Sequence, residues 1–349
     1  MSQILSTQRP GVFSSYTISQ GYTKSYSNRA VGVVARTNTQ AGGEVLAFTR
    51  ASQVEAVYGP GMMFTLCSIL FSNHVAKVYC ASAGEAEESG DAAGYEEALR
   101  QLESQADIGG VVCDNESPEI LELLKEHVLR CSNRGRERLA FGGGGEKPGE
   151  MAERLNCERF CLAAPQTGYG ETAEPSSVYL AAAYAALAVA SEHPAENLNY
   201  GEAGGSFIFN GGLGAVAEEE IDYLIQSGVG VFEPEAGGIR LIRAVTTAQN
   251  NPGYRELTTI RIADDVIVSV RGMLQQRLKG ARNSDATRES IRSQTALELA
   301  QKKDAEIIGD FDLPVVYPKE DEPTICIVEI GFSVIYAVHQ IHLTAYIQV

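Results

Sequence analysis

The stretch that decides the fold runs from Gly237 to Gly280 and reads GGIRLIRAVTTAQNNPGYRELTTIRIADDVIVSVRGMLQQRLKG. It opens with a short apolar strand over residues 239–245 and then turns at an Asn-Asn-Pro-Gly sequence. After the turn, apolar residues recur at spacings of three and four, which is helical periodicity. They are Ile260, Ala263, Val266, Ile267, Val270, Met273, Leu274 and Leu278. Thr258 and Thr259 are candidate N-caps, and Gly280 is a candidate helix end.

Before this stretch, short β-branched runs alternate with helical segments. The expected strands are residues 30–35, 44–49, 77–81, 108–113, 139–141, 160–163 and 229–232. The expected helices are residues 52–57, 62–72, 95–105, 118–131, 176–191 and 218–226, of which 176–191 is apolar nearly all round. Such alternation predicts an α/β fold, an open and mainly parallel sheet with helices on both faces.

After this stretch, a second helix is expected over residues 285–308. Ile291, Leu297 and Leu299 are available for burial, and its basic residues are available outside. Strands are expected at residues 325–330 and 332–338. The last residues, Ile341, Leu343, Ala345, Ile347 and Val349, then alternate with polar ones. This half-buried strand needs a partner, because an exposed apolar edge is an aggregation site.

Composition limits the classes of function. A length of 349 residues fits one large or two ordinary domains. The net charge of −17 argues against a general nucleic-acid binder and an anionic membrane surface. The chain has seven cysteines, which is an odd number, and no secretion signal precedes them. We therefore expect reduced cysteines in a protein made in a cytoplasm. Cys157 and Cys161 lack a matching second pair, which disfavours zinc.

Charge is unevenly distributed along the chain. Residues 84–126 carry thirteen Asp and Glu against Arg100 and Lys125, which favours a solvated outer face. Residues 271–303 carry eight Arg and Lys against three carboxylates. This basic block predicts an acidic partner or a neighbouring acidic patch, although a helix held by its own i,i+4 ion pairs is the alternative.

An ordered set of short sequences resembles the C-terminal half of contractile tail sheath proteins, from phages, phage-tail-like bacteriocins and related injection systems. In that family a strand ending in R-x-V-T-T leads through a loop to a helix carrying R-I-x-D-x-V. The matching residues here are Arg243, Val245, Thr246, Thr247, Arg261, Ile262, Asp264 or Asp265, and Val266. The resemblance covers about the last third of the chain directly, and the rest by its general pattern.

The resemblance implies a division of the chain: an N-terminal arm at 1–25, a subtilisin-like α/β domain at 26–250, a C-terminal α+β domain at 251–338 and an arm strand at 339–349. The arms would add strands to neighbouring subunits. Their expected residues are Val12, Tyr16, Ile18, Ile341, Leu343, Ala345, Ile347 and Val349. The helix over residues 285–308 would be the attachment helix that touches an inner tube, through Arg282, Arg288, Arg292, Lys302 and Lys303.

The function implied by the resemblance is structural. Subunits would polymerise as helical rings around an inner tail tube protein and contract to drive the tube through an envelope, without nucleotide hydrolysis. The partners would be further copies, the tube, and the baseplate and tail terminator proteins, with no nucleic acid and no direct membrane binding. The protein would be part of a virion or phage-tail-like particle assembled in the bacterial host cytoplasm.

The first alternative is a soluble α/β enzyme that binds a phosphorylated ligand at a Gly-rich loop. Residues 141–147 read FGGGGEK but lack the phosphate-loop and dinucleotide patterns, and residues 201–214 are Gly-rich without a pattern, so both are expected to be loops. Three histidines and the Ser176-Ser177 pair form no protease signature. We therefore expect no catalytic, metal or cofactor site. A second alternative is a structural ring protein that does not contract.

Overall fold

The computed structural model describes residues 30–37, 44–85, 92–170, 172–209, 217–277 and 281–346. Several predictions fall on other residues. The expected arm residues Val12, Tyr16, Ile18, Ile347 and Val349 lie outside the described part of the chain, as does the expected helix end at Gly280.

A nine-stranded sheet forms the centre of the body, in the order β2-β3-β1-β4-β5-β6-β11-β12-β9. The six strands from β3 to β11 are parallel to their neighbours, and β2, β12 and β9 are antiparallel. The expectation of a mainly parallel α/β sheet is confirmed. The strands are β1 (Ala30–Thr37), β2 (Leu46–Phe48), β3 (Lys77–Glu85), β4 (Ile108–Cys113), β5 (Leu139–Gly143), β6 (Phe160–Ala164), β9 (Glu202–Gly204), β11 (Val229–Glu235) and β12 (Gly238–Leu241).

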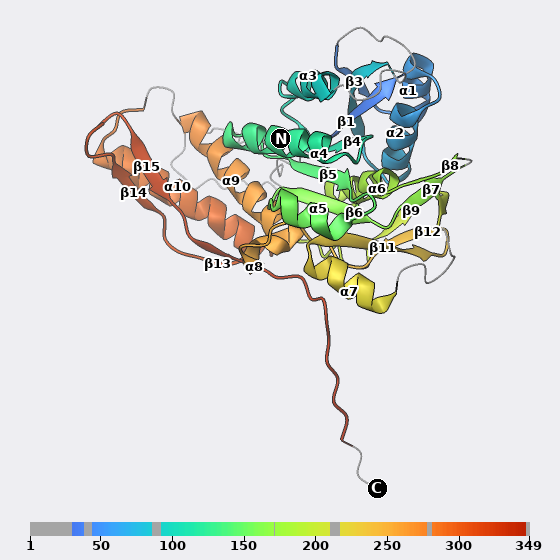
Figure 1. The fold of residues 1–349 in the computed structure, drawn as a ribbon. Coiled ribbons are helices and arrows are strands. Elements are labelled where there is room, and N and C mark those ends of the chain that lie inside the picture. The colour runs from blue at the N-terminus through green and yellow to red at the C-terminus, as the bar shows by residue number, and fades with distance from the viewer. Residues whose placement is uncertain are drawn as a thin grey trace, which may run out of the picture.

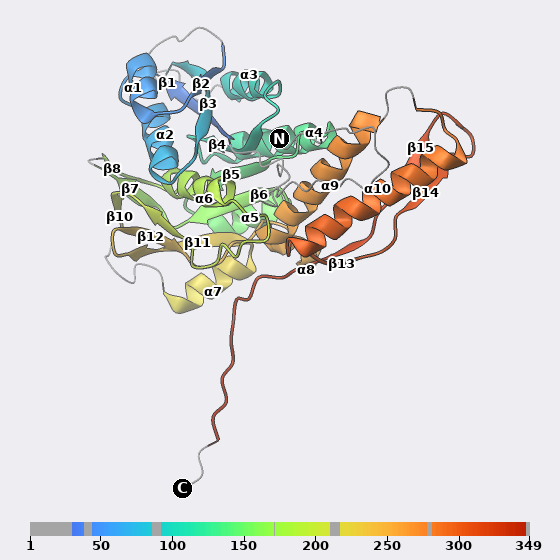
Figure 2. The same ribbon diagram turned by 180° about the vertical axis from the view of Figure 1, so that it is seen from behind.

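Helices cover both faces of this sheet (Figures 1 and 2). One face packs on α1 (Ala51–Tyr58), α2 (Met62–Ser72) and α6 (Val178–Ala190) in one apolar core. The other face packs on α3 (Ala92–Leu102), α4 (Pro118–Asn133), α5 (Pro148–Leu155) and α7 (Glu218–Gln226) in a second core. None of the helices in the described ranges is both long and apolar enough to cross a bilayer.

A small antiparallel sheet, β10-β7-β8, lies beside the main one, with β7 at Thr167–Tyr169, β8 at Thr172–Ser176 and β10 at Phe207–Ile208. The expectation that residues 201–214 form only a loop is therefore wrong, because β9 and β10 lie within them. The side-chain amide of Asn73 helps to hold β9 in place. Its oxygen accepts from the Gly204 N–H at 2.7 Å, and its nitrogen donates to the Gly204 carbonyl at 3.0 Å, so it acts as a strand partner for β9.

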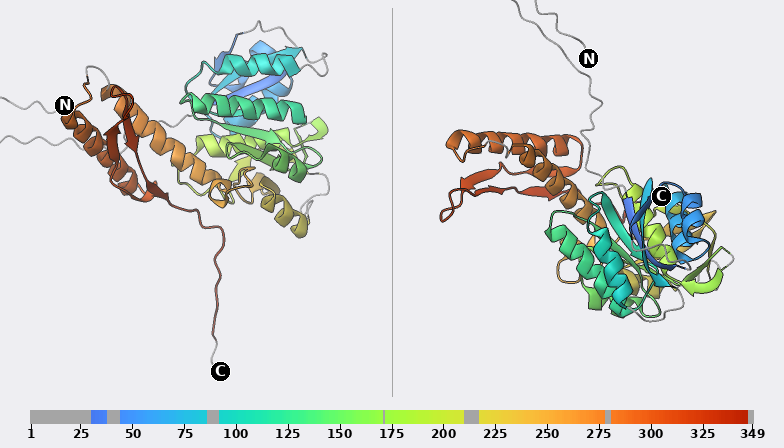
Figure 3. Two further views of the ribbon diagram at one scale, coloured as in Figure 1. Left: turned by 60° about the vertical axis from the view of Figure 1, so that its left-hand side comes forward. Right: turned by 90° about the horizontal axis from the view of Figure 1, so that it is seen from above.

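The C-terminal part projects from the body (Figure 3). It contains α8 (Pro252–Arg255), α9 (Leu257–Arg277), α10 (Asp285–Asp304), β13 (Ile308–Phe311), β14 (Val315–Pro318), β15 (Cys326–Glu329) and β16 (Phe332–Val334). β13 pairs with β16 and β14 pairs with β15, so these strands form a two-stranded antiparallel ribbon along α10. A third apolar core lies between this ribbon and the two long helices.

Three expectations about these helices need correction. α9 begins at Leu257, so Thr258 and Thr259 lie in its first turn rather than at its N-cap. α10 ends at Asp304, because Ile308 pairs with Val334 in the ribbon. Leu297 was expected to be buried but is 53% exposed, since α10 turns Thr295 and Leu299 toward the core instead.

Candidate functional site: the α9 junction and the outer face of α10

The charged residues of the Arg-Ile-Ala-Asp-Asp sequence at the start of α9 reach three different parts of the molecule. Arg261 donates from Nη2 to the Ser191 hydroxyl at 2.8 Å and to the His193 carbonyl at 3.1 Å. Asp264 accepts a bidentate pair from the Arg159 guanidinium at 2.7 and 2.8 Å. Asp265 accepts from Lys302 Nζ of α10 at 2.5 Å. One turn of α9 therefore holds a loop, the sheet and α10 together.

Burial sets the electrostatics of this junction. Arg261 has no ion pair with the described residues, and its Nη1 is buried without a hydrogen-bond partner. Burial lowers the pKa of its guanidinium to about 10, although the nearby carboxylates of Glu196 and Asp265 oppose that change. The Arg159–Asp264 and Lys302–Asp265 pairs are both largely withdrawn from water.

α9 also contributes to two apolar cores at once. Leu257 and Ile260 belong to the core between the sheet and α6, whereas Ile262 and Val266 belong to the C-terminal core. Further along, Arg271 donates to the Glu137 carboxylate at 2.5 and 2.9 Å. The helix is thus fixed to the body at several points along its length.

Sequence patterns did not single out Arg159 or Glu137. Each lies just before a strand and next to residues of opposite charge, so the sequence gives no reason to expect a distant partner. Only the fold brings them to α9, because their partners Asp264 and Arg271 are 105 and 134 residues away.

The basic side chains of α10 have acidic partners within the chain. Arg288 pairs with Asp285, Arg292 with Glu289 at 3.1 Å, and Lys303 with Asp310 at 2.9 Å. Arg282, just before the helix, is exposed and makes no ion pair with the described residues. The alternative of a helix held by its own pairs is thus partly realised, at i,i+3 spacing.

Lys302 requires a correction, since it was expected on the outer surface with Lys303. Its side chain is only 8% exposed and is paired with Asp265, whose side chain is 6% exposed. Leaving either charge buried and unpaired is costly, so this pair forms part of the interior of the junction. Lys302 is therefore withdrawn from the outer face of α10.

Residues 335–346 carry no regular secondary structure and extend away from the body (Figures 1 and 3). Ile341 and Leu343 are 88% and 90% exposed, and Ala345 is exposed as well. The segment leaves β16 past the loop before β9, where the Asn197 amide donates to the Val338 carbonyl at 2.9 Å. Its alternating apolar side chains have no partner strand among the described residues.

An apolar groove lies next to β15. It has a volume of about 430 Å³ between α9, α10 and the ribbon, and its walls include Met273, Leu274, Ala286, Ile291, Cys326 and Val328. The groove and the open edges of the ribbon lie in the same part of the molecule as the basic residues of α10.

The Glu116 carboxylate lies beside Gly143 and Gly145 of the first Gly-rich loop and caps the start of α6. Glu116 Oε1 accepts from the Ser176 hydroxyl at 2.7 Å, from the Ser177 N–H at 2.5 Å and from the Val178 N–H at 3.1 Å. The first turn of α6, an anion-binding position, is therefore occupied by the chain's own side chain. Lys147 of the loop pairs with Glu150 at 2.8 Å.

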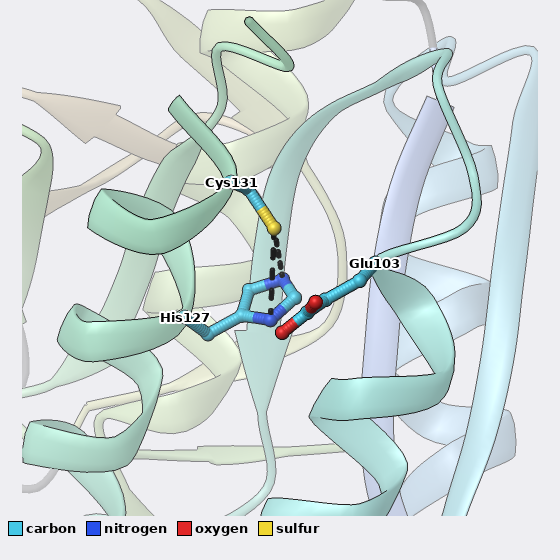
Figure 4. A group of neighbouring side chains, drawn as sticks. All are labelled: Glu103, His127 and Cys131. Carbon is cyan, nitrogen blue, oxygen red and sulfur yellow. Dashed lines mark hydrogen bonds between the residues drawn. The ribbon is translucent and has the colours of Figure 1, made fainter. Parts of the chain in front are cut away.

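Glu103, His127 and Cys131 form the one cluster of metal-ligand residue types found among the described residues (Figure 4). Arg130 and Arg134 bind the Glu103 carboxylate at 2.6 and 2.9 Å, and Arg138 Nη1 lies 3.3 Å from His127 Nε2. The Cys131 sulfur lies 3.8 and 4.0 Å from the two ring nitrogens, so it sits over the ring face. Burial and the adjacent guanidiniums lower the pKa of His127 to about 3. Such a cationic surrounding does not fit a metal ion.

Comparison with known proteins gives three findings. Residues 249–348 match the family model of the phage tail sheath C-terminal domain. The tail sheath protein of Bacillus phage SP01 is 30% identical over 224 residues, a match that covers 61% of this chain and 38% of that protein. This chain thus spans less than half the length of that relative.

Two solved structures share the fold. The contracted helical sheath of the anti-feeding prophage aligns with a TM-score of 0.73 at 14% identity, covering 97% of this chain and 99% of that one. A chain of the anti-feeding prophage baseplate aligns with a TM-score of 0.72 at 12% identity, covering 98% of this chain and 100% of that one.

The chain is thus similar to contractile tail sheath proteins in the sequence of its last third and in its fold. The comparisons confirm the resemblance to contractile tail sheath proteins that the Arg-x-Val-Thr-Thr and Arg-Ile-x-Asp sequences indicated. The relatives reported carry the names of sheath and baseplate components, so the alternative of a soluble α/β enzyme is not supported.

Proposed function

We propose that this chain is the structural subunit of a contractile tail sheath, which polymerises as helical rings around an inner tube and contracts to drive the tube through a target envelope. The observation that carries the proposal is an exposed alternating segment at residues 341–346, in a chain whose last third matches sheath C-terminal domains. In this proposal residues 26–250 are the subtilisin-like α/β domain, residues 251–338 the C-terminal α+β domain, and residues 1–25 and 339–349 the two arms.

The arms join neighbouring copies by strand addition. A two-stranded ribbon has two open edges and is marginal alone, and both edges can accept further strands. A strand beside β15 would lay its apolar side chains into the groove between α9 and α10. The segment carrying Ile341, Leu343 and Ala345 has the alternation that such a position requires.

The outer face of α10 contacts the tube. Arg282, Arg288, Arg292 and Lys303 are the residues available for this contact, with Lys302 withdrawn into the junction. The ion pairs of Arg292 and Lys303 are exposed, and such pairs contribute only about 0.2–1 kcal/mol each. Carboxylates of an acidic tube can therefore replace them, and many weak contacts around a ring can be released during contraction.

The remaining parts of the proposal concern the whole particle. Contraction gains intersubunit contact area and needs no nucleotide. The ends of the sheath meet baseplate and tail terminator proteins, without contact to nucleic acid or membrane. The particle, a phage tail or a phage-tail-like device, assembles in the host cytoplasm.

Electron microscopy of the purified chain tests the arms. Full-length protein should form wide hollow tubes, and a variant lacking residues 341–349 should stay dispersed. A matched control replaces Thr344 with Ser, which keeps the alternation and should assemble normally. If full-length protein forms only small discrete particles, even when co-expressed with its tube protein, the sheath proposal fails.

The tube contact is tested by charge reversal on α10. Arg292→Glu together with Arg282→Glu should abolish co-purification of the tube while self-assembly into tubes persists. Arg50→Glu, an exposed change just before α1, is the control and should leave tube binding intact. Unchanged tube binding by the α10 variant would overturn the contact without touching the arms.

A further inference from the structure

The exposed face of α7 carries a dense negative charge. Glu218, Glu219, Glu220 and Asp222 are all exposed, and they make no ion pair with the described residues. The helix contains no basic residue to balance them, and Tyr223 beside them is 52% exposed. Most other charged side chains of the helices have a partner within the chain, so this face stands apart.

A patch of opposite charge lies at the end of α4. Arg130, Arg134 and Arg136 all bind one residue, Glu103, the first two through its carboxylate and the third through its carbonyl. One carboxylate cannot balance three guanidinium groups, and the Arg134 side chain is 66% exposed. In a chain with a net charge of −17, this patch is a second basic region, besides the basic block at residues 271–303.

The topology places the two patches at opposite ends of the parallel strands, the arginine patch where the strands begin and the acidic face where they end. α4 follows β4 and precedes the parallel strand β5, so its last turn lies at the edge where the strands begin. α7 leads into β11, which is parallel to β6, so its first turn lies at the edge where the strands end. Both helices cover the same face of the sheet (Figure 1). The two patches therefore cannot meet within one chain.

We propose that the acidic face of α7 docks on the arginine patch of a second copy of this chain. Charge complementarity steers such a contact and fixes its register. Because the two patches differ, the contact is head-to-tail, and such contacts build rings or open helical assemblies instead of closed dimers. The inference rests on the proposed sheath function, and it supplies a contact between bodies that is independent of the arms.

The simpler account is that these charges only stabilise their own helices. Acidic residues in a first turn and basic residues in a last turn both interact favourably with the helix dipole. That account predicts an effect on the stability of each chain, whereas docking predicts an effect between chains. Reciprocal charge reversal separates the two.

The experiment compares three forms of the full-length chain. The acidic variant is Glu219→Lys with Glu220→Lys, the basic variant is Arg134→Glu with Arg136→Glu, and the third form combines all four changes. Each double variant should raise the protein concentration needed for self-assembly about tenfold or more, since attraction becomes repulsion. The combined variant should return to near the wild-type concentration. Sedimentation at low and high salt measures this, and high salt should weaken wild-type assembly.

Arg50→Glu just before α1 with Glu55→Lys in α1, across the sheet, is the control and should assemble as the wild type does. Thermal unfolding of every variant shows whether the folded chain is retained. Double variants that assemble normally, a combined variant as defective as the double variants, or wild-type self-association that ignores salt would each overturn the inference. If deletion of residues 341–349 still disperses the tubes in that case, only the docking contact fails, and the sheath proposal stands.

Discussion

At the residue scale, the Arg-Ile-Ala-Asp-Asp sequence of α9 is explained by what its side chains reach. The sequence alone could show that these residues resemble a motif of sheath proteins. It could not show which side chains they contact. Asp264 and Asp265 are adjacent in the chain, yet they bind Arg159 of the body and Lys302 of α10. Periodicity describes a helix face well. It says nothing about which distant cation a buried carboxylate meets.

The Lys302–Asp265 pair gives the first prediction. Asp265→Ala should lower the free energy of unfolding by about 3–5 kcal/mol, because it leaves the Lys302 ammonium buried and unpaired. Adding Lys302→Met should recover most of that loss, since the pair is then replaced by apolar volume. Urea unfolding of the three proteins measures the coupling. If the double variant is as unstable as Asp265→Ala, the pair does not act as a unit.

His127 predicts a pH dependence. Burial, with Arg138 and Arg130 beside it, holds its pKa at about 3 in the folded chain, below the usual value of about 6.5. The unfolded chain therefore binds an extra proton below pH about 6.5, and the folded state loses about 2 kcal/mol between pH 7 and 5 from this group. His127→Gln should remove that part of the slope. Urea midpoints across this range test it, with His74→Gln as the exposed control.

The third prediction concerns substitution of Glu116. Its carboxylate accepts from the first N–H groups of α6, the most buried helix of the body. Glu116→Ala should destabilise the fold by about 2–3 kcal/mol, because these donors lose a charged acceptor. Glu116→Gln keeps one acceptor oxygen and should cost clearly less. Equal losses in the two variants would contradict this expectation, because they would show that a neutral acceptor oxygen contributes nothing at this helix end and that only the charged carboxylate stabilises it.

At the element scale, local sequence predicted some elements closely and missed others for physical reasons. Strand Ile108–Cys113 and helix Glu218–Gln226 match their expected bounds, because each combines a clear pattern with clear ends. β13 and β14 were missed, since their residues include Gly309, Asp310 and Pro318, which weaken a strand pattern. Their order comes from pairing with β16 and β15, which no local pattern reveals.

The two leucines of α10 give the fourth prediction. Leu297 is 53% exposed and Leu299 is fully buried, although they are two positions apart on one helix. Leu299→Ala should cost about 2–5 kcal/mol because it opens a cavity in the C-terminal core. Leu297→Ala should change stability by less than about 0.5 kcal/mol. Thermal unfolding of both variants checks this, and a large loss at Leu297 would mean that α10 is rotated from the orientation described.

At the scale of the whole molecule, α9 connects the body and the C-terminal part, because it packs into a core of each. A boundary near residue 250 stays a proposal. The helix α9 packs into both parts. Leu257 and Ile260 lie in the body core, and Val266 lies in the C-terminal core. A helix shared by two cores resists rotation of one part against the other. This suits the proposed sheath lattice, in which rigid subunits turn while their arms stay joined.

The shared helix predicts how the chain unfolds. Because losing the body core also removes the support of α9, the two parts should unfold in one cooperative transition rather than two. Calorimetry of the unassembled chain should give a single peak whose calorimetric and van't Hoff enthalpies agree. Inserting a flexible Gly-Ser-Gly segment after Val266 should split this peak, while the same insertion in the exposed turn at residue 320 should not. Two peaks in the unmodified chain would mean that α9 does not couple the parts, and that rotation of the body need not carry the C-terminal part with it.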